Sequence, residues 1–180
     1  SDLGLTGISE LTHFACTSED INNLSYALTI SAAVREVWLP KFRSVIAALR
    51  ERAIELRDDA MLAHTHGQPA TPTTMGKELA VFVYRLDRIL TQIEATEYLG
   101  KFSGATGTFA AHLAADATQD WPAISNEFVT SLGLTWNPLT TQIESHDWQA
   151  ELYSRISHAN RVLHNLCTDV WTYISMGYFR

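Results

Sequence analysis

Three short stretches of the sequence combine histidine, hydroxyl and amide side chains, which are groups that transfer protons and orient polar substrates. They are residues 13–23, residues 64–72 and residues 140–147. We expect all three at helix ends or in loops, where a rigid scaffold usually carries its binding and catalytic residues. These clusters are therefore the candidate sites.

The cluster at 64–72 contains two histidines, His64 and His66, in the sequence His-Thr-His-Gly-Gln-Pro-Ala-Thr-Pro. An imidazole suits proton transfer near neutral pH, and the two prolines stiffen the loop that carries it. Two histidines separated by one residue could also bind zinc, but no third ligand has a recognisable zinc spacing. The residues alone leave open a proton-transfer site, a metal pair and an ordinary surface loop.

The other two clusters each precede a helical stretch. Free N–H groups and the helix dipole at a helix start favour a carboxylate or phosphate, although Ser18 or Asp20 could simply be the N-cap. In the third cluster, Gln142 offers a donor and an acceptor to a polar substrate. There too, Ser145 or Asp147 could do no more than cap the last helix.

Amphipathic helices must position these clusters, because apolar residues recur at intervals of three and four along most of the chain. We expect helices over about 20–58, 73–100 and 120–131, with a kink or break at Pro40. Thr73 or Thr74 is the expected cap of the second helix. The segments at about 59–72, 103–108 and 136–142 are expected to be loops.

The last helix has the most regular pattern in the sequence, since its apolar residues alternate steps of four and three as in a coiled coil. They are Leu152, Ile156, Ala159, Leu163, Leu166, Val170 and Tyr173. No segment has a convincing period of two, so the sequence predicts an all-α protein. Long helices pack side by side in an elongated bundle, and a symmetric oligomer usually covers the flanks of such a bundle.

Composition narrows the class of protein further. The 180 residues, 46% of them hydrophobic, are enough for one domain with a substantial core. The net charge of −7 argues against a nucleic-acid partner, and no apolar run reaches the ~18 residues of a membrane helix. Cys16 and Cys167 cannot form a disulfide framework and are expected in the core. We therefore expect a cytoplasmic protein.

Taken together, the clusters resemble the fumarase/aspartase superfamily, and within it the adenylosuccinate lyases. Thr17-Ser18-Glu19-Asp20 resembles the Thr-Ser-x-Asp region of these enzymes. Thr65-His66-Gly67-Gln68, followed by Pro-Ala-Thr-Pro, resembles their Thr-His-x-Gln region. The stretch 140–144 and the glycine loop at 103–112 match further regions in the same order, so the resemblance spans essentially the whole chain.

This resemblance implies a β-elimination that needs no cofactor and no metal. The enzyme would release fumarate from adenylosuccinate to give AMP, and from the succinyl-aminoimidazole carboxamide ribotide of purine nucleotide synthesis. His66 would be the general acid that protonates the departing nitrogen. The implied substrate-binding residues are Thr17, Ser18, Thr65, Gln142 and His13.

The resemblance also implies a homotetramer whose active sites are each assembled from three subunits. In these enzymes the base is a serine on a loop with the signature Gly-Ser-Ser-x-Met-Pro-x-Lys-x-Asn, which does not occur in the 180 residues. Their N-terminal and C-terminal domains are not matched either. We therefore expect residues 1–180 to be a central helical-bundle domain that is inactive alone. The alternatives are another fumarate-releasing lyase, a metal-dependent hydrolase using His64 and His66, and a non-catalytic helical interaction module.

Overall fold

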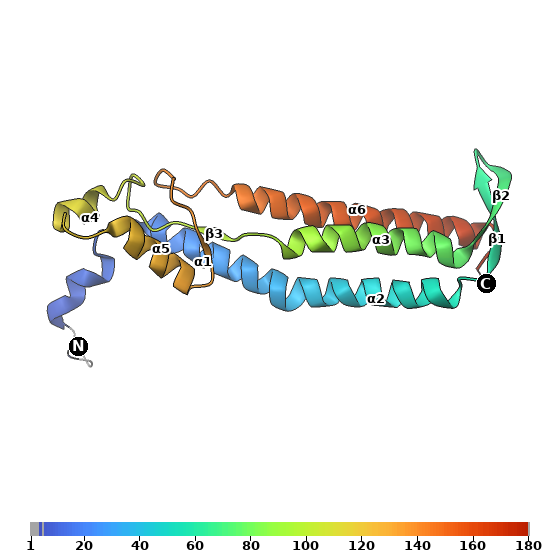
Figure 1. Cartoon of the computed structure of the whole chain (residues 1–180), viewed down its shortest axis with the longest axis horizontal. Helices are drawn as coiled ribbons and strands as arrows, with labels where there is room; N and C mark the ends of the chain where they lie inside the picture. Colours follow the sequence, from blue (N-terminus) through green and yellow to red (C-terminus); the bar gives the residue numbers. More distant parts are fainter. Residues whose placement is uncertain (1–3, 5, 180) are drawn as a thin grey trace. The chain divides into compact units, whose positions relative to one another are not determined.

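The computed structural model describes residue 4 and residues 6–179, which divide into two compact units (Figure 1). The first unit contains residues 1–33 and 97–148, and the second contains residues 34–96 and 149–180. The chain passes between the units after residues 33, 96 and 148. Each unit is therefore built from segments that are distant in the sequence.

The first unit combines short helices with one pair of very short strands. In chain order it contains a 3₁₀ helix (Thr6–His13), α1 (Ser18–Ala32), β3 (Leu99–Gly100), α4 (Ala110–Ala115), α5 (Trp121–Ser131) and β4 (Thr135–Trp136). Strands β3 and β4 pair in parallel. A Cβ atom on Gly100 would lie 2.6 Å from the side chain of Leu24, so the absence of a side chain allows β3 to pack tightly against α1.

The second unit is a helical bundle with a β-hairpin. It contains most of a π-helical segment (Ala33–Trp38), then α2 (Leu39–Glu55), β1 (Ala60–Thr65), β2 (Gln68–Thr74), α3 (Met75–Glu94) and α6 (Asp147–Ser175), whose first two residues belong to the first unit. Helices α2, α3 and α6 lie side by side in this unit (Figure 1). Their apolar stripes form its core, as the helical spacing predicts.

The predicted helical pattern is confirmed over most of the chain. All seven residues of the heptad stripe in α6 are buried or half-buried. In α3 the apolar residues at spacings of three and four are also covered: Leu90 is half-buried, and the buried ones are Leu79, Phe82, Val83, Leu86, Ile89 and Ile93. Thr74 caps α3, since its hydroxyl accepts a hydrogen bond from the backbone N–H of Lys77 at 3.2 Å. The fold is therefore mainly α-helical, with long helices packed as a bundle.

The prediction of a loop at 59–72 is wrong, because this segment forms the antiparallel hairpin of β1 and β2. Most of its side chains are exposed, and Met61 at its base is the one strand residue that is buried. Strands that bury so little leave no apolar alternation in the sequence. The all-α fold class holds for the chain as a whole, and the prediction of a loop is wrong at the segment that carries His66.

Two helix boundaries also differ from the prediction. Helix α3 ends at Glu94 rather than at Gly100, because residues 99 and 100 pair with β4. The stretch predicted at 20–58 is interrupted as expected near Pro40, but the irregular part is the π-helical segment that directly precedes α2. Pro40 lies in the first turn of α2 with helical residues before it, and its missing N–H leaves a gap in the hydrogen-bond ladder where the π-helical segment meets α2.

The two cysteines lie in different surroundings. Cys16 is half-buried and Cys167 is exposed, so the prediction of a core position is wrong for Cys167. Burial and the nearby Asp20 carboxylate raise the pKa of the Cys16 thiol, which makes it a poor nucleophile. Within the described residues, no helix is long and apolar enough to cross a membrane.

Candidate active site

The start of α1 brings together two of the residues predicted to bind substrate. Thr17 is the N-cap residue of α1 and is buried. The side-chain amide of Gln142 donates a hydrogen bond to the Thr17 hydroxyl at 3.3 Å, across 125 positions of sequence. Ser18 is exposed in the first turn of α1, and His13 is exposed in the last turn of the 3₁₀ helix. We call Thr17, Ser18 and Gln142 the Thr17 corner.

A fully buried ion pair between Asp20 and Lys101 supports the Thr17 corner. Nζ of Lys101 lies 2.7 Å from Oδ1 of Asp20, and both side chains are 0% exposed. The Asp20 carboxylate also accepts hydrogen bonds from the backbone N–H groups of Thr17, Ser103 and Gly104, at 2.9, 3.1 and 3.1 Å. The Lys101 ammonium donates to the carbonyl oxygen of Gly104 at 3.0 Å. Every charge in this cluster therefore has several partners, as burial requires.

Two further contacts tie the glycine loop to the corner. The Asn23 side chain both donates to the carbonyl and accepts from the N–H of Lys101, at 3.0 and 2.8 Å. Gly107 has a φ of +73°, and a Cβ atom there would lie 2.2 Å from the carbonyl oxygen of Thr140. Only glycine permits this approach. The loop at 103–108 is thus packed against the segment that carries Gln142.

Glu144 anchors the other side of that segment. Its side chain is 0% exposed and accepts hydrogen bonds from the Asn137 amide at 2.9 Å and the His146 backbone N–H at 2.7 Å. The His146 ring lies 3.4 Å from Glu144 and 3.7 Å from Glu19 of α1. These contacts fix the path of residues 137–146 beside the start of α1.

His112 lies behind the glycine loop in an aromatic enclosure. It is 1% exposed, and its ring contacts Phe102, Phe109 and Trp121. Burial lowers the pKa of His112, and the nearby Lys101 ammonium acts in the same direction, whereas Asp20 opposes it. His112 is therefore held as a neutral packing residue.

The other two predicted site residues lie at the tip of the hairpin in the second unit. His66 and Gly67 connect β1 to β2 as a two-residue turn, with φ values of 52° and 74°. A left-handed backbone at a residue other than glycine is uncommon and often occurs at functional sites. The His66 side chain is exposed, and its Nδ1 atom lies 3.0 Å from the Thr65 hydroxyl oxygen.

The structure therefore groups the predicted residues in two sets within separate units. Thr17, Ser18 and Gln142 belong to the first unit, and Thr65 and His66 belong to the second. The Thr17 corner offers neutral hydrogen-bond donors at a helix start, which suit a carboxylate or phosphate. The hairpin tip offers an exposed imidazole beside a hydroxyl, which suits proton transfer.

The metal interpretation of the two histidines gains no support from the geometry. The Nδ1 atom of His64 lies 3.1 Å from the carbonyl oxygen of Leu62, so it faces its own strand. Across residue 4 and residues 6–179, no three histidine, cysteine or acidic side chains form a group that could hold a metal ion.

Sequence reasoning missed the residues that support the Thr17 corner. Lys101 follows Tyr98-Leu99-Gly100, and because lysine is almost never fully buried, this order of residues does not distinguish it from a surface lysine. The sequence indicates for Asp20 only a possible cap or a motif position. Its role depends on three backbone N–H groups, two of which lie more than 80 positions away.

Comparison with known proteins identifies close relatives. The sequence profile of a family described as "Lyase" matches residues 4–180. The chain is 50% identical over 176 residues to adenylosuccinate lyase of Escherichia coli K12, which covers 98% of this chain and 39% of the relative. It is 51% identical over 177 residues to adenylosuccinate lyase of Vibrio cholerae, with the same two coverages.

A solved structure agrees with these relatives. A fumarate lyase from Mesorhizobium sp. BNC1 superposes with a TM-score of 0.78 at 27% identity, covering 90% of this chain and 37% of that one. The chain thus spans about two fifths of the length of the relatives that it matches. The match to the family profile runs through both units and through both sets of site residues, and on this ground the chain belongs to the lyase family.

Proposed function

We propose that this chain is the central part of an adenylosuccinate lyase. The whole enzyme would release fumarate from adenylosuccinate, giving AMP, and from the succinyl-aminoimidazole carboxamide ribotide. The observation that carries the proposal is the exposed imidazole of His66, held in a left-handed turn next to the Thr65 hydroxyl. Positive φ at both residues is what a two-residue hairpin turn requires, so the chemical signal is the exposed imidazole beside a hydroxyl, a pair that suits proton transfer.

The proposed reaction is an elimination across a carbon–carbon bond. A base removes a proton from the carbon next to one succinyl carboxylate and leaves an electron pair on that carbon. As the carbon–nitrogen bond breaks, this pair forms the double bond of fumarate, and the bonding pair leaves with the nitrogen, which takes a proton from protonated His66. By its resemblance to the family, the base is a serine outside residues 1–180.

The remaining residues bind the substrate in this proposal. Thr65 would donate to a succinyl carboxylate, and Gln142 would lie near the bond that breaks. Thr17 and Ser18 would donate from the start of α1, with His13 as a further contact. Because negative charge builds on a carboxylate during the reaction, fixed donors aimed at that group lower the barrier.

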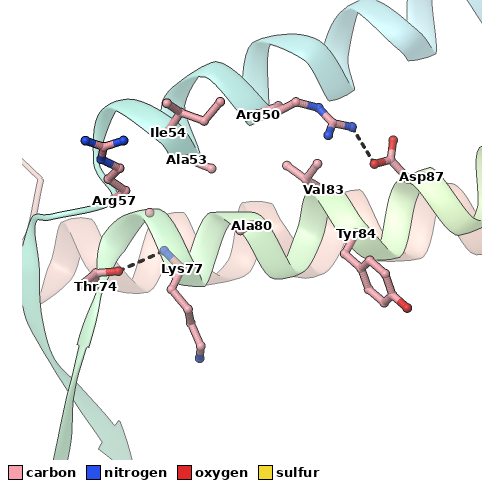
Figure 2. Close-up of a pocket in the computed structure, with 11 residues that line it drawn as sticks. Arg50, Ala53, Ile54, Arg57, Thr74, Lys77, Ala80, Val83, Tyr84 and Asp87 are labelled. Carbon is pink, nitrogen blue, oxygen red and sulfur yellow. Dashed lines mark hydrogen bonds and ion pairs between the residues drawn. The ribbon is translucent and has the colours of Figure 1, made fainter.

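We further propose that the enzyme is a homotetramer in the cytoplasm, with no membrane or nucleic-acid partner. A groove of about 550 Å³ lies between α2 and α3, and Figure 2 shows Ile54, Val83 and Tyr84 along it with the Arg50–Asp87 ion pair. Ile54 and Tyr84 are 59% and 64% exposed. Large exposed apolar side chains on long helices are typical of surfaces between subunits.

A substrate panel tests the proposed function. The protein expressed from the complete gene is mixed with adenylosuccinate, argininosuccinate, malate or aspartate, and fumarate is measured by its absorbance. We expect turnover of adenylosuccinate alone. Turnover of argininosuccinate instead would assign another lyase of the superfamily, and no turnover of any substrate would support a non-catalytic helical module.

The same assay tests the expectation that residues 1–180 are inactive alone. We expect no fumarate from this chain at any concentration, because the proposal places the base outside it. Measurable fumarate release from the purified 180-residue chain would contradict that assignment of the base.

A further inference from the structure

A tyrosine hydroxyl from the segment after α6 reaches the hairpin that carries His66. The hydroxyl of Tyr178 donates a hydrogen bond to the carbonyl oxygen of Leu62 at 2.7 Å and lies 3.4 Å from Nδ1 of His64. We propose that Tyr178 is a positioning residue that sets the direction of the Thr65–His66 tip. This inference rests on the proposed role of His66 as the general acid.

The contact falls on an irregularity of the hairpin. Leu62 lies opposite Pro72, and His64 lies opposite Pro69, so the register shifts between Leu62 and His64. Since proline has no N–H, the carbonyl of Leu62 cannot accept a hydrogen bond from the residue opposite it. The Tyr178 hydroxyl supplies a donor that Pro72 lacks, at 2.7 Å from the same carbonyl that Nδ1 of His64 approaches at 3.1 Å.

The irregularity matters because a bulge bends the strand and turns the side chains beyond it. Thr65 and His66 are the next residues along the strand after His64. A donor that fixes the Leu62 carbonyl therefore fixes the angle at which the tip leaves the bundle. Tyr178 acts on His66 through the backbone of β1.

Tyr178 is itself held by the rigid part of the second unit. Its backbone N–H donates to the carbonyl of Tyr173 in α6 at 2.9 Å, and the two rings meet edge to face at 5.9 Å. Its side chain packs against the core cluster of Ala53, Met61, Met75 and Leu79. The Tyr178 hydroxyl is therefore held in place by the core of the bundle. A residue that positions a functional side chain needs such a rigid attachment.

The hairpin is held at its base, where Met61 lies in the core and the Thr73 hydroxyl donates to Glu78 at 2.9 Å, but its outer part needs further support. Every side chain from His64 to Pro72 is exposed, and a two-stranded hairpin alone is only marginally stable in water. A displacement of about 1 Å at a reacting group can lower a rate by ~100-fold. Loss of the Tyr178 hydroxyl should therefore affect proton transfer more than substrate binding.

Removal of single hydroxyl groups provides the first test, in the protein expressed from the complete gene. We expect Tyr178→Phe to lower kcat on adenylosuccinate by about tenfold, with KM within twofold of the unchanged protein. Tyr173→Phe is the matched control, because the described residues provide no hydrogen-bond partner for its hydroxyl and the ring stays in place. We expect Tyr173→Phe to keep kcat within about twofold. An unchanged kcat in Tyr178→Phe would overturn the inference.

The same substitution in a His66→Ala background separates positioning from a general structural role. If Tyr178 acts through His66, Tyr178→Phe has no further effect on the residual rate of His66→Ala. An equal loss of rate in both backgrounds would overturn the inference and leave the proposed function intact. If His66→Ala alone retains the full rate, the proposed function fails, and this result does not depend on any Tyr178 variant.

Hydrogen exchange gives a readout that does not depend on activity. We expect the backbone N–H groups of residues 60–74 to exchange faster in Tyr178→Phe than in Tyr173→Phe, with the helices α2 and α3 unchanged. Equal exchange in the two variants across residues 60–74 would show that the hydroxyl does not hold the hairpin.

Discussion

The Thr17 corner and the hairpin tip are held in opposite ways. The corner rests on the Asp20–Lys101 ion pair, in which both side chains are 0% exposed, and this pair organises backbone from two segments of the first unit. The hairpin tip projects an exposed His66 from strands whose side chains are mostly in water. The hairpin is tied to the bundle by Met61 and Thr73 at its base and by the hydroxyl of Tyr178 at Leu62.

This difference fits the two tasks that we propose. Residues that bind a carboxylate must keep their donors in fixed positions, because reorganisation during the reaction raises the barrier. An acid that is used once per turnover must regain its proton, and an exposed imidazole can do so from solvent. These contacts indicate a rigid corner and a loosely held tip, and each can be tested by substitution.

The largest change in stability is expected from the buried ion pair. Asp20→Ala leaves the Lys101 ammonium buried without a counter-charge and removes the acceptor of three backbone N–H groups. We expect the free energy of unfolding to fall by about 3–5 kcal/mol. Urea denaturation at a fixed protein concentration measures this loss.

An exposed ion pair provides the control for that measurement. Arg52 and Glu55 pair on the surface of α2, with side chains 68% and 58% exposed. We expect Glu55→Ala to change the free energy of unfolding by less than about 0.5 kcal/mol. Equal losses in Asp20→Ala and Glu55→Ala would contradict the account of the Thr17 corner.

A smaller loss is expected where the glycine loop meets the Gln142 segment. Gly107→Ala places a methyl group on the backbone of Thr140 and should cost about 1–3 kcal/mol beyond the strain of a left-handed alanine. Gly133→Ala is the matched control, since Gly133 has a φ of +77° and nothing within 4 Å of its Cβ position. The difference between the two variants in urea denaturation isolates the close contact, and no difference would mean that the loop can move away freely.

The smallest expected effect is a dependence on pH. Because the pKa of His112 is lowered in the folded protein, the unfolded chain takes up a proton at His112 first as the pH falls. Stability that is present above the ordinary pKa of 6.5 is therefore lost progressively below it. We expect His112→Leu to reduce this pH dependence, and His158→Gln, which changes an exposed side chain, to retain it. Parallel pH profiles for His112→Leu and the unchanged protein would contradict this.

The helices could be predicted from the sequence because each buries one apolar stripe. The heptads of α6 and the stripe of α3 are both visible as spacings of three and four, and Thr74 is recognisable as a cap. These features are local, and burial at a helical period leaves a direct trace in the order of residues.

The hairpin and the buried charges could not be predicted in the same way. The hairpin is formed by backbone pairing between β1 and the proline-containing β2, and most of its side chains are exposed, so its strands have no apolar alternation. The pair His66-Gly67, flanked by Thr65 and Gln68, was the available signal, because two-residue hairpin turns favour glycine with positive φ. The Asp20–Lys101 pair depends on a contact across 81 positions, which no local pattern reveals.

Steady-state kinetics of His66→Ala and Gln142→Ala, measured side by side on adenylosuccinate, test the central claim most directly. If the tip transfers a proton and the corner binds, His66→Ala lowers kcat by at least about 100-fold with little change in KM. In the same experiment Gln142→Ala raises KM while keeping more of kcat than His66→Ala does. A kcat for His66→Ala within threefold of that of the unchanged protein would contradict the account.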